Sequence, residues 1–286
     1  INTYLDGYIR EDNIRFRDEA LSFKGRGKKF EGVNKLIEYP KMSKTYDGFE
    51  VKAEEGFIYE GEIIGAFGAN ALGKTTFMKM LAGKEESDEK IPMDSEIKVA
   101  YKPQYLYSDF SGSVRELLSG ITKDVNKTTY KKKILRPLDL EHIMENKVST
   151  LSGGEMQRVA IAIALSQETE LILLDEPSAY LDVEQRVKLA KLIRGFVEDS
   201  RKTCIIIDHD LLVLDYISDR AILFDGESGV SGHAGSPSSL KKGLNAFLKQ
   251  LDITFREEPD TGRPRANKDG SQKDQVQKKS GKYYCG

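Results

Sequence analysis

A glycine-containing segment in the first third of the chain has residue types and a spacing that suit phosphate binding. It runs from Gly68 to Thr76 and fits the pattern GxxxxGK[ST]. A strand-like apolar run precedes it and a helix-like run follows it, so backbone N–H groups and the positive end of a helix would surround an anion. The charge of Lys74 would meet the β- and γ-phosphates, and the hydroxyl of Thr75 would bind Mg²⁺. The sequence therefore predicts a nucleoside triphosphate site that uses Gly68, Asn70, Gly73, Lys74, Thr75 and Thr76.

Two adjacent carboxylates could complete this site from a second segment. Four aliphatic residues, Leu171–Leu174, precede Asp175, Glu176 and Pro177. In a parallel sheet the acidic residues would lie at the carboxyl end of the strand, where ligands bind. We expect Asp175 to hold Mg²⁺, directly or through water, and Glu176 to polarise the attacking water. In isolation, a strand that ends in an acidic turn before proline is also common.

A third segment, Leu151–Gln157, places one serine and two glycines before a helical pattern of alternating apolar and polar residues. Ser152, Gly153 and Gly154 would form a second helix N-terminus with exposed N–H groups. An ordinary capped helix, with Ser152 as N-cap and Glu155 completing the capping box, explains the same residues and is compatible with this function.

Taken together and in this order, the three motifs resemble those of ATP-binding-cassette (ABC) ATPases. The resemblance implies an α/β fold, with an ABC-type P-loop core of mostly parallel sheet and flanking helices, an inserted helical subdomain and a C-terminal hinge. It also implies ATP and Mg²⁺ as ligands. The helix start at Ser152, Gly153 and Gly154 would cap the γ-phosphate held by a second nucleotide-binding domain, so that two domains enclose two nucleotides.

Further residues match motifs of the same family. Gln104 resembles the Q-loop glutamine, which reaches Mg²⁺ and the attacking water, and Ser178–Asp182 resembles the D-loop. His209 resembles the switch histidine that contacts the γ-phosphate. Tyr39 resembles the aromatic residue that stacks on adenine, although Tyr46 is an alternative.

One loop position departs from the family pattern, because Ala71 stands where the family usually has glycine. If this position requires a positive φ angle, alanine would strain the loop, and the affinity for nucleotide could be lowered.

The two ends of the chain favour one branch, because they are similar to the hinges of the ABC-E family of ribosome-recycling ATPases, also called RNase L inhibitors. Residues 1–8 and 13–17 resemble the hinge before its second nucleotide-binding domain, and residues 251–256 and 263–268 resemble its C-terminal hinge. The D-loop ending Ser-Ala-Tyr-Leu-Asp agrees with this family. The chain is thus expected to be the C-terminal half of such a protein.

This resemblance implies several partners. They are a first nucleotide-binding domain of the same full-length protein or a second copy, the small ribosomal subunit, and release or recycling factors. Contact of Arg263–Lys268 with ribosomal RNA is a further expectation, and no membrane partner is expected. Two alternatives stay open: the nucleotide-binding subunit of an ABC membrane transporter, and a module that binds nucleotide without hydrolysing it.

The composition fits a cytoplasmic protein. Its 286 residues carry a net charge of -2 and a pI of about 6.1, which gives no general basic bias towards nucleic acid. No apolar run approaches the roughly 20 residues of a membrane span, and the N-terminus has no secretory signal pattern. The two cysteines are too few for an iron–sulfur or structural zinc site by themselves.

The elements that must position these residues alternate along the chain, which predicts a mostly parallel sheet with helices on its faces. The expected strands are Glu62–Phe67, Ile97–Tyr101, Leu171–Asp175, Thr203–Asp208 and Ala221–Asp225, and the expected helices are Lys74–Leu81, Gly154–Leu165, Val183–Asp199, Leu211–Ile217 and Pro237–Leu251. Helical patterns dominate at about 105–167, which predicts the inserted helical subdomain.

Three regions are therefore expected: a connecting arm at 1–30, the nucleotide-binding domain at 31–252, and a basic hinge or tail at 253–286. The stretch 261–286 holds seven Lys or Arg and two Asp or Glu. Such a stretch is either a solvated tail or an arm that packs on a partner subunit or on RNA phosphates.

Overall fold

The computed structural model describes residues 8–9, 14–15, 33–90, 97–104, 109–257 and 264–285. The chain divides into two compact units, one formed by Gly27–Leu244 and one that includes Asn245–Gly286. Most of the predicted arm at 1–30 lies outside the described residues. Within it, β1 (Tyr8–Ile9) and β2 (Ile14–Arg15) pair antiparallel. The predicted domain boundaries stay predictions.

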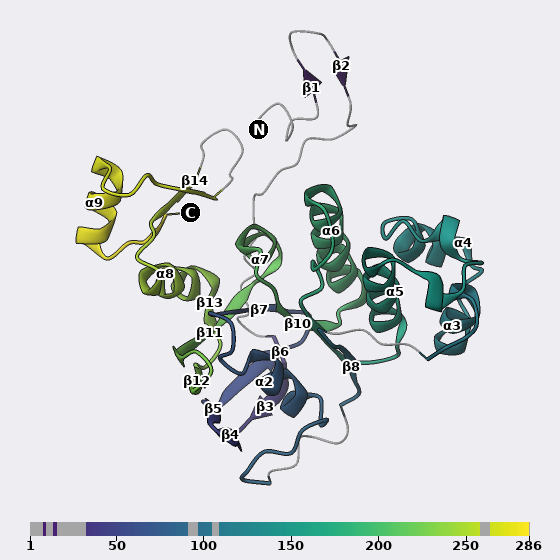
Figure 1. Cartoon of the computed structure of the whole chain (residues 1–286), viewed down its shortest axis with the longest axis horizontal. Coiled ribbons are helices and arrows are strands. Elements are labelled where there is room, and N and C mark those ends of the chain that lie inside the picture. Colours follow the sequence, from purple (N-terminus) through teal and green to yellow (C-terminus); the bar gives the residue numbers. More distant parts are fainter. Residues whose placement is uncertain are drawn as a thin grey trace. The chain divides into compact units, whose positions relative to one another are not determined.

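A nine-stranded mixed sheet forms the frame of the first unit (Figure 1). Its strand order is β4-β5-β12-β11-β7-β10-β9-β8, and β13 pairs with β11. Five neighbours, β11, β7, β10, β9 and β8, run parallel to one another. Their bounds are Arg220–Glu227, Ile63–Phe67, Thr203–Ile207, Leu171–Asp175 and Val99–Lys102. These are the five strands that the sequence predicts, with ends that differ by at most two residues.

The register of these strands brings the predicted motifs to one edge of the sheet. In β7, β9 and β10 every residue is buried, as expected for parallel strands covered on both faces. Asp175 at the end of β9 pairs with Ile207 at the end of β10, and Ile207 pairs with Ala66 near the end of β7. The phosphate loop, the acidic pair and His209 therefore all leave the sheet at its carboxyl edge, as predicted.

Antiparallel strands and one helix close the core beside this sheet, and the sequence analysis did not predict the strands. They are β3 (Lys35–Tyr39) paired with β6 (Gly56–Tyr59), and β4 (Met42–Tyr46) paired with β5 (Phe49–Ala53), while β12 (Ser231–Ala234) joins β5 to β11. Helix α2 (Lys74–Leu81) buries Phe77, Met78 and Leu81 against these strands and the central sheet. The hydrophobic core of the unit lies between them.

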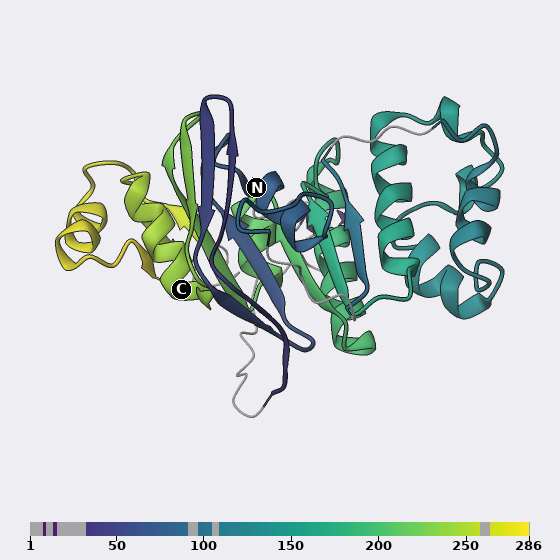
Figure 2. The ribbon, with the colours of Figure 1, turned by 90° about the horizontal axis from the view of Figure 1, so that it is seen from below.

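The inserted segment after β8 is helical, as predicted. Its elements are α3 (Val114–Ile121), α4 (Thr128–Tyr130), the π-helix η1 (Lys131–Leu135), the 3-10 turns η2 (Glu141–Ile143) and η3 (Val148–Thr150), and α5 (Gly153–Ser166). No strand occurs between residues 109 and 167, all of which the structure describes. Figure 2 shows these helices, in teal, at the β8 end of the sheet, with the purple antiparallel strands at its other end.

Helices α6 (Val183–Ser200) and α7 (Leu211–Ile217) pack together and follow the bounds predicted for them closely. Helix α8 (Leu240–Gln250) is shorter than predicted, because β13 (Ser238–Ser239) occupies part of the range assigned to it. None of the helices in the described residues is both long enough and apolar enough to cross a membrane.

The second unit shows that the described part of the basic C-terminal stretch is folded. A three-stranded sheet consists of β14 (Phe255–Glu257), β15 (Pro264–Ala266) and β16 (Tyr284–Cys285). Helix α9 (Gln272–Ser280) lies between β15 and β16 in the sequence. The buried Thr254 hydroxyl donates to Asp274 at 2.6 Å and accepts from the side chain of Asn267 at 2.9 Å. A purely solvated tail would have no such buried polar network.

Candidate nucleotide-binding and catalytic site

A pocket of about 590 Å³ lies at the start of α2. Its lining residues are Phe49, Asn70, Ala71, Leu72, Gly73, Lys74, Thr75, Thr76, Gln104, Asp175, Glu176, Ile207 and Gly229. Gly73 is the N-cap of α2 with a φ angle of 81°, and a Cβ atom there would lie 2.7 Å from Val51 Cβ. Only glycine fits this position, so the loop can wrap closely around an anion.

Lys74 lies folded against the loop that it belongs to. Its ammonium donates to the carbonyl oxygens of Gly68 at 2.8 Å and Ala69 at 2.6 Å. Burial lowers the pKa of this lysine, whereas the charges of Glu176 and Asp175 oppose that shift. A phosphate in the pocket would offer Lys74 an anionic partner in place of two neutral carbonyl groups, which is a stronger kind of hydrogen bond.

Thr75 and Asp175 together fit a magnesium ion. The hydroxyl of Thr75 donates to Asp175 Oδ2 at 2.7 Å, and Asp175 Oδ1 is buried without a hydrogen-bond partner among the described residues. A buried, unpartnered carboxylate oxygen costs free energy unless a cation or its water shell reaches it. Burial raises the pKa of Asp175, and the Thr75 hydroxyl opposes this shift. This donor set suits Mg²⁺ that is otherwise held by phosphate oxygens and water.

In the described residues no group of three or more His, Cys, Asp or Glu side chains could hold a metal ion without other ligands.

The structure brings together the three residues that the sequence analysis assigned to catalysis. Gln104 Nε2 donates to Glu176 Oε1 at 2.8 Å, and His209 Nε2 lies 2.7 Å from the same oxygen. Gln104 and Glu176 line the pocket, whereas His209 does not line it and has a side chain that is about half exposed. Such a cluster can orient a water molecule and accept its proton once Glu176 is released from one of these partners.

A buried pair of hydrogen bonds joins the D-loop to Asp208, the residue between β10 and His209. The hydroxyl of Ser178 donates to Asp208 Oδ1 at 2.7 Å, and the N–H of Ser178 donates to Asp208 Oδ2 at 3.1 Å. Asp208 Oδ1 also accepts from the N–H of Asp210 at 2.9 Å. These bonds connect the D-loop, which follows Glu176, to the two aspartates that flank His209.

The sequence analysis missed three residues at this site. Phe49, at the start of β5, lines the pocket. Lys102 and Gln157 both donate to the carbonyl oxygen of Glu176, at 3.3 and 2.6 Å. Lys102 and Gln157 lie within motifs that were recognised, but a contact with a backbone carbonyl leaves no trace in residue type or spacing.

Ser152 is the N-cap of α5, and its hydroxyl accepts from the N–H of Glu155. The Glu155 carboxylate accepts in return from the N–H of Ser152 at 2.8 Å, which completes the predicted capping box. Ser152 and Gly153 are exposed, and neither these two residues nor Gly154 lines the pocket at Lys74.

Tyr39 does not lie at the site, which corrects the sequence-based assignment. Its side chain is buried, with 1% of its surface exposed, and its ring packs edge-on against Phe77 with 5.7 Å between the ring centres. Burial also raises the pKa of its hydroxyl. A base cannot stack on a ring enclosed in the core. Tyr46 does not line the pocket either, and Phe49 is the aromatic residue that does.

Comparison with known proteins adds three relatives and one family. The family described as ABC transporter matches residues 54–179. An ABC transporter ATP-binding protein of Methanocaldococcus jannaschii is 49% identical over 99% of this chain, which covers 48% of that protein. Translation initiation factor RLI1 of Saccharomyces cerevisiae is 40% identical over 99% of this chain and is covered to 47%. ABC transporter E family member 3 of Arabidopsis thaliana is 34% identical over 59% of this chain and is covered to 97%.

A solved structure agrees with these relatives. The archaeal ribosome recycling factor aABCE1, in its complex with the archaeal ribosomal stalk protein aP1, matches with a TM-score of 0.93 and 48% identity, over 99% of this chain and 55% of that chain. The chain spans about half the length of the first curated relatives that it matches.

Proposed function

Because this chain belongs to the ABC-E family of ATP-binding-cassette ATPases, we propose that it binds ATP with Mg²⁺ in the pocket at Lys74 and hydrolyses it when a second cassette closes over that pocket. The observation that carries the proposal is the convergence of Thr75, Asp175 and Glu176 at the start of α2, within one pocket.

Phosphate binding is assigned to the loop from Gly68 to Thr76, with Asn70, Gly73, Lys74 and Thr76 presenting N–H groups and one ammonium. Phe49 is proposed to contact the base, because it is the aromatic side chain of the described lining. Thr75, Asp175 and Gln104 would hold Mg²⁺, which supplies positive charge at the β- and γ-phosphate oxygens.

Glu176 is proposed to accept a proton from the attacking water, with its carboxylate positioned by Gln104 and His209. His209 would also meet the γ-phosphate when it leaves Glu176. General-base assistance of this kind is worth a factor of roughly 10²–10⁴ in rate.

The exposed start of α5 is proposed to serve a different nucleotide. Ser152, Gly153 and Gly154 lie outside the pocket of their own chain, and the N–H groups of Gly153 and Gly154 stand at a helix N-terminus, whereas that of Ser152 donates to Glu155. They would therefore cap the γ-phosphate bound by a second cassette. We assign that cassette to a first nucleotide-binding domain in the same full-length protein, or to a second copy of this chain, in agreement with relatives about twice as long.

At the level of the cell, we propose a cytoplasmic role in ribosome recycling, in which closure of two cassettes on ATP separates ribosomal subunits. Support comes from the matched structure, which is of a ribosome recycling factor. The small subunit, release or recycling factors, and ribosomal RNA near Arg263–Lys268 are the proposed partners. Co-sedimentation with ribosomal subunits supports this role, and co-purification with an integral membrane protein would instead indicate a transporter subunit.

The decisive experiment compares ATP turnover by the full-length protein with turnover by its Glu176→Gln variant. We expect a loss of 10²-fold or more at this site, with ATP affinity within about threefold of wild type, because glutamine keeps the shape but cannot accept the proton. Glu170→Gln, at a partly exposed carboxylate just before β9, is the matched control. Unchanged turnover in Glu176→Gln would remove Glu176 from its proposed role.

A further inference from the structure

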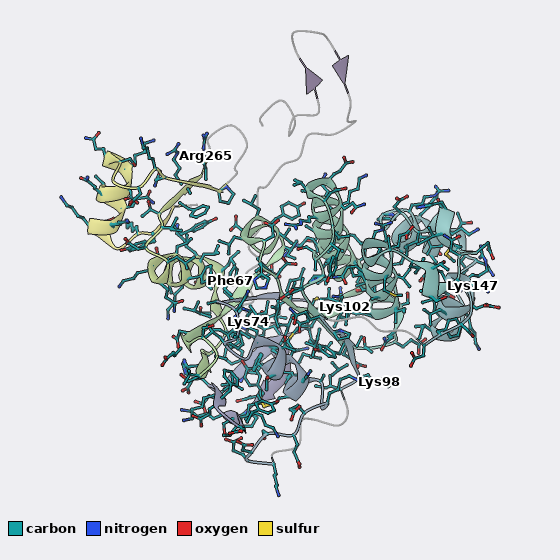
Figure 3. The ribbon with its side chains drawn as sticks, in the orientation of Figure 1. Phe67, Lys74, Lys98, Lys102, Lys147 and Arg265 are labelled. Atoms are coloured by element: carbon teal, nitrogen blue, oxygen red, sulfur yellow. The ribbon has the colours of Figure 1, made fainter. Side chains whose placement is uncertain are left out.

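Lys102, the last residue of β8, is a lysine almost wholly withdrawn from water. It is 2% exposed, and it shares one face of the strand with the buried Ala100. Lysine is rarely buried unless it is paired, because an ammonium ion without partners loses its hydration. Figure 3 labels both lysines of this region: Lys98 at the outer edge of the ribbon, and Lys102 towards its interior. Of these two lysines, Lys98 is the exposed one.

The ammonium of Lys102 finds its partners at the end of the neighbouring strand. It donates to the carbonyl oxygen of Asp175 at 2.7 Å and to that of Glu176 at 3.3 Å. Burial lowers the pKa of Lys102 to about 8, and the negative charges of Asp175, Glu176 and Asp208 oppose this shift. Lys102 thus contacts the backbone of the acidic pair, and it does not line the pocket itself.

These contacts matter because the backbone of Glu176 is strained. Its φ angle is 48°, in the left-handed region that residues other than glycine rarely adopt. Four groups hold it there. The carbonyl of Ile207 accepts from its N–H at 2.8 Å, and its own carbonyl accepts from Gln157, from Lys102 and from the N–H of Ala179. A strained residue keeps its geometry only when its surroundings fix it.

We propose that Lys102 is a positioning residue for ATP hydrolysis, an inference that rests on the proposed function. By holding the carbonyl groups of Asp175 and Glu176, it keeps the backbone of Glu176 left-handed and directs its carboxylate towards Gln104 and His209. The positive charge also offsets the repulsion between adjacent carboxylates at this edge of the sheet. Lys102 contacts neither nucleotide nor water in this role.

The test compares Lys102→Met with Lys98→Met in the full-length protein. Methionine keeps the length of the alkyl chain but removes the charge and the three donors. We expect kcat at this site to fall 10-fold or more in Lys102→Met, while KM for ATP and the affinity for ADP stay within about threefold. Lys98→Met should match wild type in all three. Lys102→Arg, which keeps the charge and the donors, should recover at least fivefold of the lost kcat.

Two results would overturn the inference while the wild-type protein hydrolyses ATP. One is a kcat for Lys102→Met equal to that of Lys98→Met. The other is an equal loss in kcat and in ADP affinity, which would make Lys102 a general structural residue. If Lys102→Met does not fold, as judged by thermal unfolding, Lys102→Gln replaces it, and a Gln variant as active as the Arg variant refutes the role of the charge. Absence of hydrolysis in the wild-type protein would instead refute the proposed function.

Discussion

Ala71 is the residue of the phosphate loop whose backbone conformation does not suit its side chain. Its φ angle is 58°, so this position does require the left-handed region, and alanine strains the loop as the sequence analysis anticipated. We expect Ala71→Gly to raise the free energy of unfolding by about 0.5–1 kcal/mol, because glycine adopts this conformation without the clash that alanine suffers. Thermal unfolding of the two proteins measures the difference.

The matched control is Ala82→Gly at the end of α2, where φ is −78° and the conformation is right-handed. That substitution should lower the free energy of unfolding, because glycine increases the conformational entropy of the unfolded chain and relieves no strain in the folded one. If Ala71→Gly is as destabilising as Ala82→Gly, the loop is not strained at position 71.

Other roles of single residues could not be predicted because they depend on depth and on distant neighbours. Tyr39 has the residue type of a base-stacking aromatic, but its environment in the core is set by Phe77, far along the chain. Lys102 looks like any solvated lysine in the sequence, and only the fold places it against the carbonyl oxygen of Asp175. The placement of four site residues could be predicted, because segments that follow the strands of a parallel sheet leave it at the same edge. They are Lys74, Thr75, Asp175 and Glu176.

The junction between β6 and β7 contains a buried carboxylate whose ionisation destabilises the folded chain. Glu62 is fully buried and accepts from the N–H of Tyr59 at 2.6 Å and from Arg220, on β11, at 3.2 Å. Burial raises its pKa to about 7, and the hydrogen bond from Tyr59 and the charge of Arg220 only partly oppose this. The protonated form is therefore favoured in the folded chain more than in the unfolded chain.

Stability should consequently depend on pH through Glu62. With a pKa raised from 4.5 to about 7 in the folded chain, its contribution is fully present below pH 4.5 and is lost as the pH rises through 7. At about 1.4 kcal/mol per pH unit, the loss is on the order of 3 kcal/mol. Glu62→Gln cannot ionise, so its stability relative to wild type should rise between pH 5 and pH 8.

Denaturant unfolding of both proteins at the two pH values tests this expectation. Glu60→Gln, at an exposed carboxylate two residues away, serves as the control and should show no such change. A pH-independent difference between wild type and Glu62→Gln would contradict it.

Elements with a strong pattern were predictable, and those formed by tertiary context were not. Continuous apolar runs indicated β7, β9 and β10, and helical patterns indicated α2, α5 and α6, with a predicted capping box at the start of α5. Strands β3 to β6 carry mixed polar and apolar residues, since each has one face towards the core and one towards water, and their pairing across the sheet decides their structure. The start of α8 was misplaced because β13, which occupies Ser238–Ser239, pairs with β11.

For the molecule as a whole, the exposed start of α5 predicts that two cassettes act together. We expect Ser152→Arg to leave ATP binding by this chain within about threefold of wild type, since Ser152 does not line its own pocket. ATP-dependent pairing with a second cassette should be lost, because the arginine side chain would occupy the space proposed for the γ-phosphate beside the N–H groups at the start of α5. Calorimetry measures the binding, and sedimentation with ATP in a Glu176→Gln background measures the pairing.

Ser113→Arg provides a stringent control, because Ser113 caps α3 in the same kind of capping box with Glu116. Loss of either cap should cost about 1 kcal/mol of stability, so any defect specific to Ser152→Arg reports on pairing. Loss of ATP binding by the chain carrying Ser152→Arg would contradict action on a second cassette, and so would pairing at the wild-type level.

Gln104 and His209 both contact the same carboxylate oxygen of Glu176. While Glu176 Oε1 is engaged by both side chains, at 2.8 and 2.7 Å, it has little capacity left to take up a proton from water. A single cassette in this arrangement would bind ATP without hydrolysing it. Hydrolysis would begin only when a conformational change frees that oxygen. Unproductive hydrolysis is thereby avoided before the cassette associates with a second one, and activation requires only that Glu176 exchange these two hydrogen bonds for others.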